Sequence, residues 1–208
     1  VQVTNQRISE WTNDSSPVTH QLATHHALRF TFHVSRFTFY GASMKHLAIL
    51  GSTGSIGRNA LSVVEAHPDE FVVAGLAAKG SVDLMERQVR QFHPRLVALN
   101  NREAARQLRE RLRASEGNAP PHNQVEVLSG AEGILAIATM EEVDVVLEAI
   151  GGSAGLLPTL EAIKAGKDLA FVNKEVLVMG GSLVMQAVKA HGVHLLPVDS
   201  EISAIFQC

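Results

Sequence analysis

The sequence of 208 residues has one cysteine, no surplus of positive charge and no long apolar run. The single cysteine, Cys208, permits no disulfide within the chain, which excludes a disulfide-stabilised secreted fold. The formal net charge of −3 leaves no excess of lysine and arginine to neutralise nucleic-acid phosphates. No apolar run approaches the roughly 20 residues that a membrane-spanning helix needs. With 46% hydrophobic residues, the composition predicts a soluble, intracellular globular protein with one sizeable core.

Residues 1–43 differ from the rest of the chain because they show no sustained periodicity. A short motif at residues 29–32 recurs at residues 36–39, and its alternation is compatible with a strand or hairpin. Three interpretations compete: a targeting segment, a structured extension, or upstream sequence translated ahead of a start at Met44. We favour the last, because Met44 directly precedes a complete strand pattern, and we expect residues 1–43 to be disordered or weakly packed.

From Met44 onward, short apolar runs alternate with stretches of helical periodicity. Val82, Met85 and Val89, for example, recur at spacings of three and four residues. A proline pair within residues 115–123 predicts a loop there. Seven strands joined by helices predict an α/β fold, Rossmann-like and doubly wound, with helices on both faces of a mainly parallel sheet. The predicted strands are residues 46–50, 71–77, 96–99, 125–128, 143–149, 168–172 and 193–197.

The most informative motif follows the first predicted strand. Gly51, Gly54 and Gly57 come directly after the apolar residues 47–50, and a helical pattern opens at Ile56. Glycine lets the backbone approach a ligand closely, and the N-terminus of a helix attracts an anion. The motif therefore predicts a site for the pyrophosphate of a dinucleotide. A glycine-rich turn without a ligand is the alternative.

The end of the second predicted strand indicates which dinucleotide is bound. In NAD-binding folds a carboxylate near this position binds the ribose 2′-hydroxyl, whereas a basic residue accommodates a 2′-phosphate. Here Lys79 and Ser81 follow the strand, and no carboxylate does. This favours NADP over NAD, with a solvated surface lysine as the alternative.

Two later strand ends carry polar clusters, at residues 173–175 and 199–201. Asp199 and Glu201 supply two carboxylates on one turn, which are donors that a hard divalent cation prefers. A helix N-cap at Asp199 or Ser200 is the alternative. Lys174 offers a point charge to an anionic substrate, or else a surface ion pair of little energetic weight.

Four motifs in this order resemble the 1-deoxy-D-xylulose 5-phosphate reductoisomerase family. They lie at residues 51–57, 154–160, 173–175 and 196–207. The resemblance extends over residues 44–208 and implies an NADPH-binding domain at 44–194, with the beginning of a catalytic, metal-binding domain at 195–208. It implies an NADPH-dependent oxidoreductase of the non-mevalonate route to isoprenoids. That enzyme rearranges 1-deoxy-D-xylulose 5-phosphate and reduces the product to 2-C-methyl-D-erythritol 4-phosphate.

The resemblance also implies roles for individual residues. The implied cofactor contacts are Thr53, Gly54, Ser55, Ile56, Lys79, Gly80, Ser81, Asn173 and Glu175. Lys174 and Glu201 are implied as catalytic residues, and the implied substrate contacts are Lys174, Ser200 and Glu201. Asp199 and Glu201 are implied as ligands of a divalent metal, either Mn, Mg or Co. The full-length enzyme is implied to be a homodimer acting on a small sugar phosphate, with no nucleic-acid or membrane partner. A bacterial cytoplasm is favoured over a plastid.

The sequence departs from the family pattern at Ile202, where the family has histidine, and in the loop at residues 79–81, which lacks an asparagine. The family's third metal carboxylate and its phosphate-binding residues would follow Cys208. We therefore expect a truncated chain that binds NADPH without turning over substrate. Two alternatives stay open: another NADP-dependent dehydrogenase, which would need a nucleophilic cysteine, and a non-catalytic nucleotide-binding module.

Overall fold

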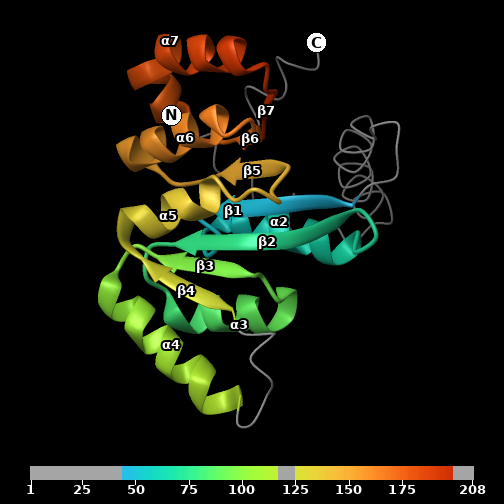
Figure 1. The fold of residues 1–208 in the computed structure, drawn as a ribbon, viewed down its shortest axis with the longest axis vertical. Coiled ribbons are helices and arrows are strands. Elements are labelled where there is room, and N and C mark those ends of the chain that lie inside the picture. The colour runs from blue at the N-terminus through green and yellow to red at the C-terminus, as the bar shows by residue number, and fades with distance from the viewer. Residues whose placement is uncertain (1–43, 117–124, 199–208) are drawn as a thin grey trace, which may run out of the picture. The chain divides into compact units, whose positions relative to one another are not determined.

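A seven-stranded sheet lies at the centre of the computed structural model, which describes residues 44–116 and 125–198 (Figure 1). Every strand pair is parallel, in the order β4-β3-β2-β1-β5-β6-β7. The strands are β1 (Lys45–Leu50), β2 (Phe71–Ala78), β3 (Leu96–Leu99), β4 (Glu126–Ser129), β5 (Val145–Glu148), β6 (Asp168–Phe171) and β7 (Leu195–Pro197). The predicted Rossmann-like α/β fold with a parallel sheet is confirmed.

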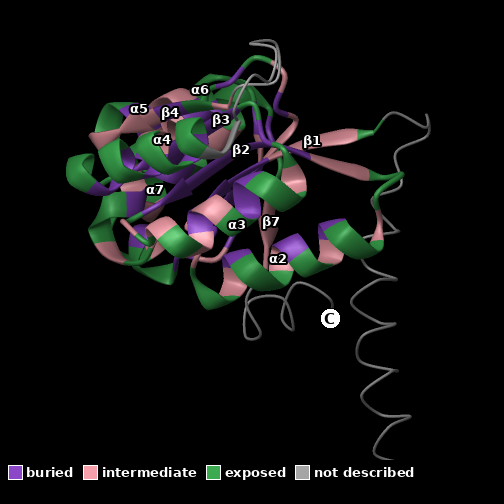
Figure 2. Cartoon of the chain, turned by 90° about the horizontal axis from the view of Figure 1, so that it is seen from below, coloured by how far each residue is buried: buried purple, intermediate pink, exposed green. Residues whose placement is uncertain are grey.

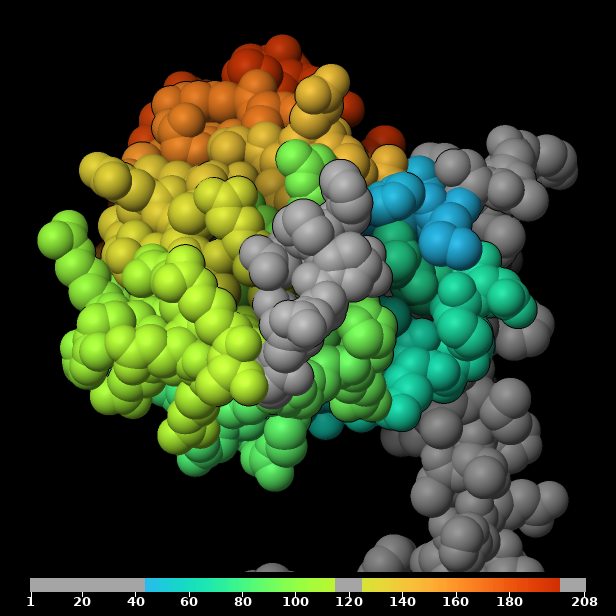
Figure 3. All heavy atoms as spheres, turned by 60° about the horizontal axis from the view of Figure 1, so that its bottom comes forward, coloured from blue at the N-terminus to red at the C-terminus, as the bar shows by residue number. Residues whose placement is uncertain are grey.

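Helices cover both faces of the sheet. One face carries α2 (Ser55–Ala66), α3 (Val82–Phe92) and α4 (Arg102–Glu116). The other carries α5 (Gly130–Ala138), α6 (Leu156–Lys164), α7 (Lys174–His191) and the short 3-10 helix η2 (Gly152–Gly155). In the space-filling view the surface runs from the green of α4 through the yellow of α5 to the orange and red of α6 and α7 (Figure 3). None of the described helices combines the length and the apolar character needed to cross a membrane.

Two hydrophobic clusters fill the space between the sheet and its helices. Successive side chains of a strand point to opposite faces. Leu50 therefore packs with Ile163 of α6 and Val176 of α7, whereas Ile49 packs with Met85 of α3 on the opposite face. Burial of each side chain of this size contributes about 1.5–3 kcal/mol to the free energy of folding. Figure 2 shows the buried residues concentrated in the strands and on the sheet-facing sides of the helices.

Several predicted boundaries are corrected by the structure. Six of the seven strands begin or end one or two residues away from the prediction, a common discrepancy at element ends. β5 begins at Val145 instead of Val143, because the Val143 amide donates to the Met140 carbonyl in the preceding turn (3.2 Å). α4 continues to Glu116, past the predicted start of a loop at residue 115, on a run of good helix formers.

The topology brings the loops that follow the strands to one edge of the sheet. β1 lies between β2 and β5, so the strand order reverses there. Because all strands are parallel, the loops after β1, β2, β5 and β6 leave the sheet at the ends of these strands, which we call the carboxyl edge. Ligands of such sheets bind at this edge, beside the reversal. The candidate site is therefore expected around the loop after β1.

Candidate functional site

The turn from β1 to α2 packs backbone directly against backbone. Gly51 has a φ of +90°, and a Cβ there would lie 2.4 Å from the carbonyl oxygen of Ala149. A Cβ on Gly57, in the first turn of α2, would lie 2.4 Å from the carbonyl oxygen of Gly51. Both positions require glycine, because no other residue fits without displacing backbone. This packing brings the N-terminus of α2 to the carboxyl edge.

In the part of the chain that the structure describes, no side chain caps the N-terminus of α2. Its N-cap residue is Gly54, so no side chain at that position accepts from the first-turn amides. Thr53 and Ile56 are half-buried beside it, and Ser55 is exposed. The helix begins at Ser55, one residue before the predicted start. The uncapped amides and the positive end of the helix dipole together form a geometry that binds phosphate.

A buried pair of side chains fixes this turn onto α3. The Ser52 hydroxyl donates to Gln88 Oε1 (2.8 Å), and Gln88 Nε2 donates to the Ser52 carbonyl (2.9 Å). Both residues are buried. Gln88 was not predicted from the sequence; the available signal was a single amide on the apolar side of α3, between Met85 and Val89.

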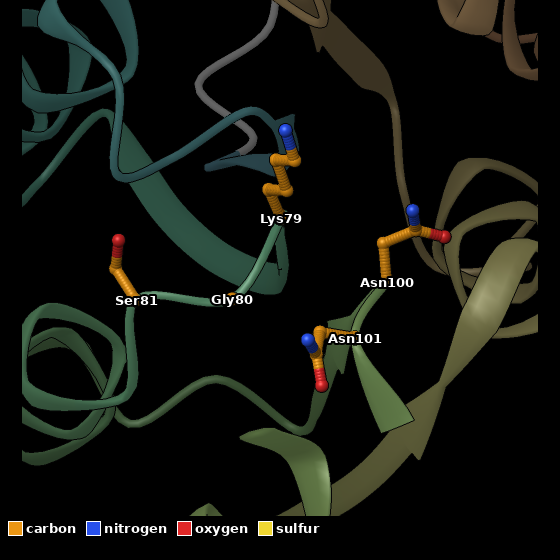
Figure 4. A pocket seen from close by; sticks show the side chains of 5 residues that line it. All are labelled: Lys79, Gly80, Ser81, Asn100 and Asn101. Atoms are coloured by element: carbon orange, nitrogen blue, oxygen red, sulfur yellow. The ribbon is translucent and has the colours of Figure 1, made fainter. Parts of the chain in front are cut away.

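A hollow of about 450 Å³ lies between the loops that follow β2 and β3 (Figure 4). Its lining residues are Lys79, Gly80, Ser81, Asn100 and Asn101. The Asn101 amide donates to the Lys79 carbonyl (2.9 Å), and Asn101 Oδ1 accepts from the first turn of α4. These bonds join the two loops. The exposed Lys79 and Ser81 then offer an ammonium and a hydroxyl, which are groups that bind a phosphate monoester.

The hollow thus brings together the three residues predicted after β2 and adds two that were not predicted. Asn100 and Asn101 directly follow β3, so they lie at the same edge as the glycine turn. Their position was a usable signal, because two adjacent amides at the end of a predicted strand belong to the carboxyl edge in any parallel sheet.

The Asn173 side chain points into the protein and not towards a ligand at the carboxyl edge, and the residue is only 4% exposed. Its Oδ1 accepts from the Val176 amide (3.1 Å), which caps α7. Its Nδ2 donates to the carbonyls of Ile150 and Gly152 in the loop after β5. Both amide hydrogens are used within the protein, which leaves the backbone of Asn173 for a ligand. Lys174 and Glu175 are exposed in the first turn of α7.

Glu148, the last residue of β5, is a buried carboxyl group that was not predicted from the sequence. Its Oε1 accepts from the Ile150 amide (3.0 Å), whereas its Oε2 has no hydrogen-bond partner among the described residues. Burial raises the pKa of Glu148 to about 8, with a smaller contribution from the negative charge of Glu175. The signal in the sequence was a single acid at the end of the apolar strand β5.

The residues predicted to hold a metal, Asp199 and Glu201, lie outside the described residues, as does Ser200. Within residues 44–116 and 125–198, no three histidine, cysteine or acidic side chains are arranged to hold a metal ion. The chain reaches the carboxyl edge just before Asp199, because the Val198 amide donates to the Phe171 carbonyl at the end of β6 (3.0 Å).

Comparison with known proteins agrees with this geometry. The family model described as 1-deoxy-D-xylulose 5-phosphate reductoisomerase matches residues 47–181. The reductoisomerase of Geotalea uraniireducens is 54% identical over 164 residues, covering 79% of this chain and 40% of that protein. The reductoisomerase of Thermodesulfovibrio yellowstonii is 47% identical over 165 residues, covering 79% of this chain and 41% of that protein. The chain therefore spans about 40% of the length of these curated relatives.

Solved structures of reductoisomerases match this chain as well. The Zymomonas mobilis reductoisomerase in complex with NADPH is 37% identical, with a TM-score of 0.72, covering 80% of this chain and 41% of that one. A DOX-P reductoisomerase in complex with NADPH, fosmidomycin and magnesium is 40% identical, with a TM-score of 0.73, covering 79% of this chain and 39% of that one. With its glycine turn, its parallel sheet and these matches, the chain belongs to the 1-deoxy-D-xylulose 5-phosphate reductoisomerase family.

Proposed function

We propose that this chain provides the NADPH-binding part of an enzyme that isomerises and reduces 1-deoxy-D-xylulose 5-phosphate to 2-C-methyl-D-erythritol 4-phosphate. The observation that carries the proposal is the uncapped N-terminus of α2, held at the carboxyl edge by Gly51 and Gly57. Family membership supports it, as do the NADPH complexes among the solved relatives.

The dinucleotide would lie across the loops after β1 and β2. Thr53, Gly54, Ser55 and Ile56 would surround the pyrophosphate, with the amides of the first turn of α2 as donors. The close backbone packing of the glycine turn fits this role, because a Cβ at Gly57 would displace the turn itself. When bound, NADPH supplies the hydride for the reduction step.

The hollow beside Lys79 would hold the adenosine 2′-phosphate. Lys79 would contribute charge, and Ser81 and the Gly80 backbone would contribute polar contacts. Among the described residues no carboxylate lines the hollow, which fits a phosphate better than a ribose hydroxyl. At the opposite side of the turn, we propose cofactor contacts from the Asn173 backbone and Glu175.

The remaining roles concern substrate and metal. We propose Asp199 and Glu201 as ligands of a divalent cation (Mn, Mg or Co), with Lys174, Ser200 and Glu201 in contact with the substrate and Lys174 and Glu201 catalytic. Carboxylates suit such a cation, which would polarise the substrate carbonyl. Because β7 pairs within the main sheet, we place the start of the catalytic part after Pro197, three residues past the predicted boundary at 194.

For the full-length protein we propose a homodimer in a bacterial cytoplasm. The family resemblance supports the dimer, and the bacterial sources of the curated relatives support the location. Sedimentation of the full-length protein tests the dimer; a monomer at micromolar concentration would overturn it.

Calorimetric titration of the chain with NADPH and NADH tests the cofactor proposal. NADPH should bind more tightly, and Lys79→Met should weaken NADPH binding about tenfold while leaving NADH unchanged, because one charged phosphate contact is lost. Lys189→Met is the matched control: it removes the same charge in the last turn of α7, at the other end of that helix from Lys174. A folded chain that binds neither dinucleotide would overturn the proposal.

A segment exchange tests the activity. Residues 44–198 would replace the matching segment of the Geotalea uraniireducens reductoisomerase, and NADPH oxidation would be followed with 1-deoxy-D-xylulose 5-phosphate and Mg²⁺. We expect the hybrid to be active. A folded hybrid that binds NADPH but oxidises none would contradict the proposed reaction while leaving the cofactor site intact.

A further inference from the structure

The side chains of Glu148 and Asn173 are buried beside the loop between β5 and α6, and no proposed ligand contact uses these two side chains. Glu148 is fully buried at the end of β5, and its Oε1 accepts from the Ile150 amide. Asn173 Nδ2 donates to the Ile150 carbonyl and, at 2.9 Å, to the Gly152 carbonyl. We call Glu148, Ile150, Gly152, Gly155 and Asn173 the acid–amide cluster.

Gly155 closes the cluster from the side of η2. A Cβ at this position would lie 2.5 Å from Glu148 Oε1 and 2.6 Å from Asn173 Nδ2. The acid and the amide therefore lie against bare backbone, with no room for a further methyl group. By contrast, a Cβ at Gly151 in the same loop would meet nothing within 4 Å.

The charge state of Glu148 decides whether this arrangement is stable. Burial raises the pKa of the carboxyl to about 8, so it is mostly neutral at pH 7. Glu175, in the first turn of α7, is the charged group whose field raises the pKa further, whereas the Ile150 amide and the uncharged Asn173 side chain lower it. Gly155 of η2 faces the carboxyl with backbone alone. Above pH 8 the ionised carboxyl would be a buried charge whose Oε2 has no partner among the described residues. Such a charge is costly unless the surroundings open to water.

The cluster lies on the side of the sheet where the nicotinamide end of a dinucleotide would lie. β2 and β3, which carry the hollow for the 2′-phosphate, are on one side of β1; β5 and β6 are on the other. A dinucleotide that crosses the reversal of strand order therefore extends from the hollow over the glycine turn to the loops after β5 and β6.

We infer that Glu148 is a positioning residue that, as a neutral acid, holds the loop after β5 and the start of α7 in the arrangement that receives the nicotinamide half of NADPH. The inference rests on the proposed dinucleotide function. It makes binding of that half sensitive to alkaline pH, while binding of the adenosine half is not.

The test compares two ligands that share the 2′-phosphate. Dissociation constants for NADPH and for 2′,5′-ADP, which occupies the adenosine half alone, are measured on the 208-residue chain between pH 7 and pH 9.5. If only protein with a neutral Glu148 binds the nicotinamide half, the ratio of the NADPH constant to the 2′,5′-ADP constant rises about 30-fold over this range. Glu148→Gln, which keeps the shape and cannot ionise, should hold the ratio constant.

A glycine pair tests the packing of the cluster. Gly155→Ala should raise the NADPH dissociation constant about tenfold at pH 7 and leave that of 2′,5′-ADP unchanged, because the added methyl displaces Glu148 or Asn173. Gly181→Ala is the control: it lies within α7, outside the loop after β5, where a Cβ would meet nothing within 4 Å, and it should change neither constant.

The outcomes separate this inference from the proposed function. A pH-independent ratio in the wild-type chain, or the same rise in Glu148→Gln, overturns the role of Glu148 alone. A folded wild-type chain that binds neither ligand at pH 7 overturns the dinucleotide site and this inference together.

If Glu148→Gln does not fold, hydrogen exchange of the ligand-free wild-type chain decides. The protection factor of the Ile150 amide should fall about tenfold or more between pH 7 and pH 9.5. The Ala149 amide, bonded to the Leu50 carbonyl (2.9 Å), should keep its protection. Equal behaviour of the two amides overturns the inference.

Discussion

The α-carbon of Gly57 faces the carbonyl oxygen of Gly51 so closely that a Cβ would lie 2.4 Å from it. The same Cβ would lie 2.6 Å from the Ser52 α-carbon. The first turn of α2 therefore packs directly against the loop after β1, and we propose that this loop and this turn together bind the pyrophosphate. The short distance between α2 and this loop is possible because residue 57 has no Cβ.

Gly57→Ala should therefore destabilise the protein by about 2–4 kcal/mol and lower NADPH affinity, because the helix must move off the loop. Urea unfolding and calorimetry measure the two effects. Gly181→Ala is the matched control: it lies in α7, where a Cβ meets nothing within 4 Å, and alanine there should stabilise by up to about 1 kcal/mol. Equal stability of the two variants would contradict the packing of α2 described above.

The buried pair of Ser52 and Gln88 yields a second prediction. Gln88→Leu removes both hydrogen bonds and leaves the Ser52 hydroxyl and carbonyl without those partners, at about 1–3 kcal/mol for each buried group. NADPH affinity should fall as well, since the pair anchors the glycine turn. Gln91→Leu, which removes an exposed hydrogen bond to Glu65, should change the free energy of unfolding by less than about 0.5 kcal/mol. A neutral Gln88→Leu would refute the anchoring role.

Asn173 combines two functions that can be separated by substitution. Asn173→Ser keeps an oxygen that can cap α7 but loses the two donated hydrogen bonds to the loop after β5; Asn173→Ala loses all three. We expect the alanine variant to be less stable than the serine variant by about 1 kcal/mol, the usual contribution of an N-cap. Thermal unfolding of both measures the difference. Identical stabilities would show that the cap contributes nothing here.

The pH dependence of stability should reveal Glu148 directly. The pKa of Glu148 is raised from 4.5 to about 8 on folding, so between these values the native state keeps a proton that the unfolded state has released. The contribution of Glu148 to the free energy of unfolding is fully present below pH 4.5. It is lost as pH rises towards 8, at about 1.4 kcal/mol per pH unit. Wild type should therefore lose roughly 4 kcal/mol relative to Glu148→Gln between pH 5 and pH 8. Urea unfolding at three pH values measures this, and parallel profiles would contradict it.

Much of the fold was predictable because the strands are buried on both faces. Apolar runs such as residues 47–50 stand out against helices with a three-to-four-residue period, and seven such runs in alternation leave a parallel sheet as the natural arrangement. Element ends were less predictable. Val143 belongs to the predicted strand that contains β5, but a local hydrogen bond to Met140 holds it in a turn.

The site was predictable where it depends on chain position, and not where it depends on side-chain packing. Gly51 and Lys79 follow strands, so a parallel topology alone brings them to one edge. Gln88 and Glu148 depend on partners that are distant in the sequence. Gln88 is bonded to Ser52, and the Glu148 carboxyl lies beside Asn173. No local pattern marks such pairs, and the inward turn of the Asn173 side chain likewise depends on carbonyls more than 20 residues away.

In the proposed mode of binding, one dinucleotide spans the uncapped start of α2 and the hollow beside Lys79. Mapping NADPH-induced shifts of backbone amides by NMR tests it most directly. The amides of Ser55, Ile56, Gly80 and Ser81 should shift together and saturate at the same NADPH concentration, whereas the Lys189 amide should not shift. Saturating NADPH that leaves the amides of Ser55 and Ile56 unshifted would contradict it.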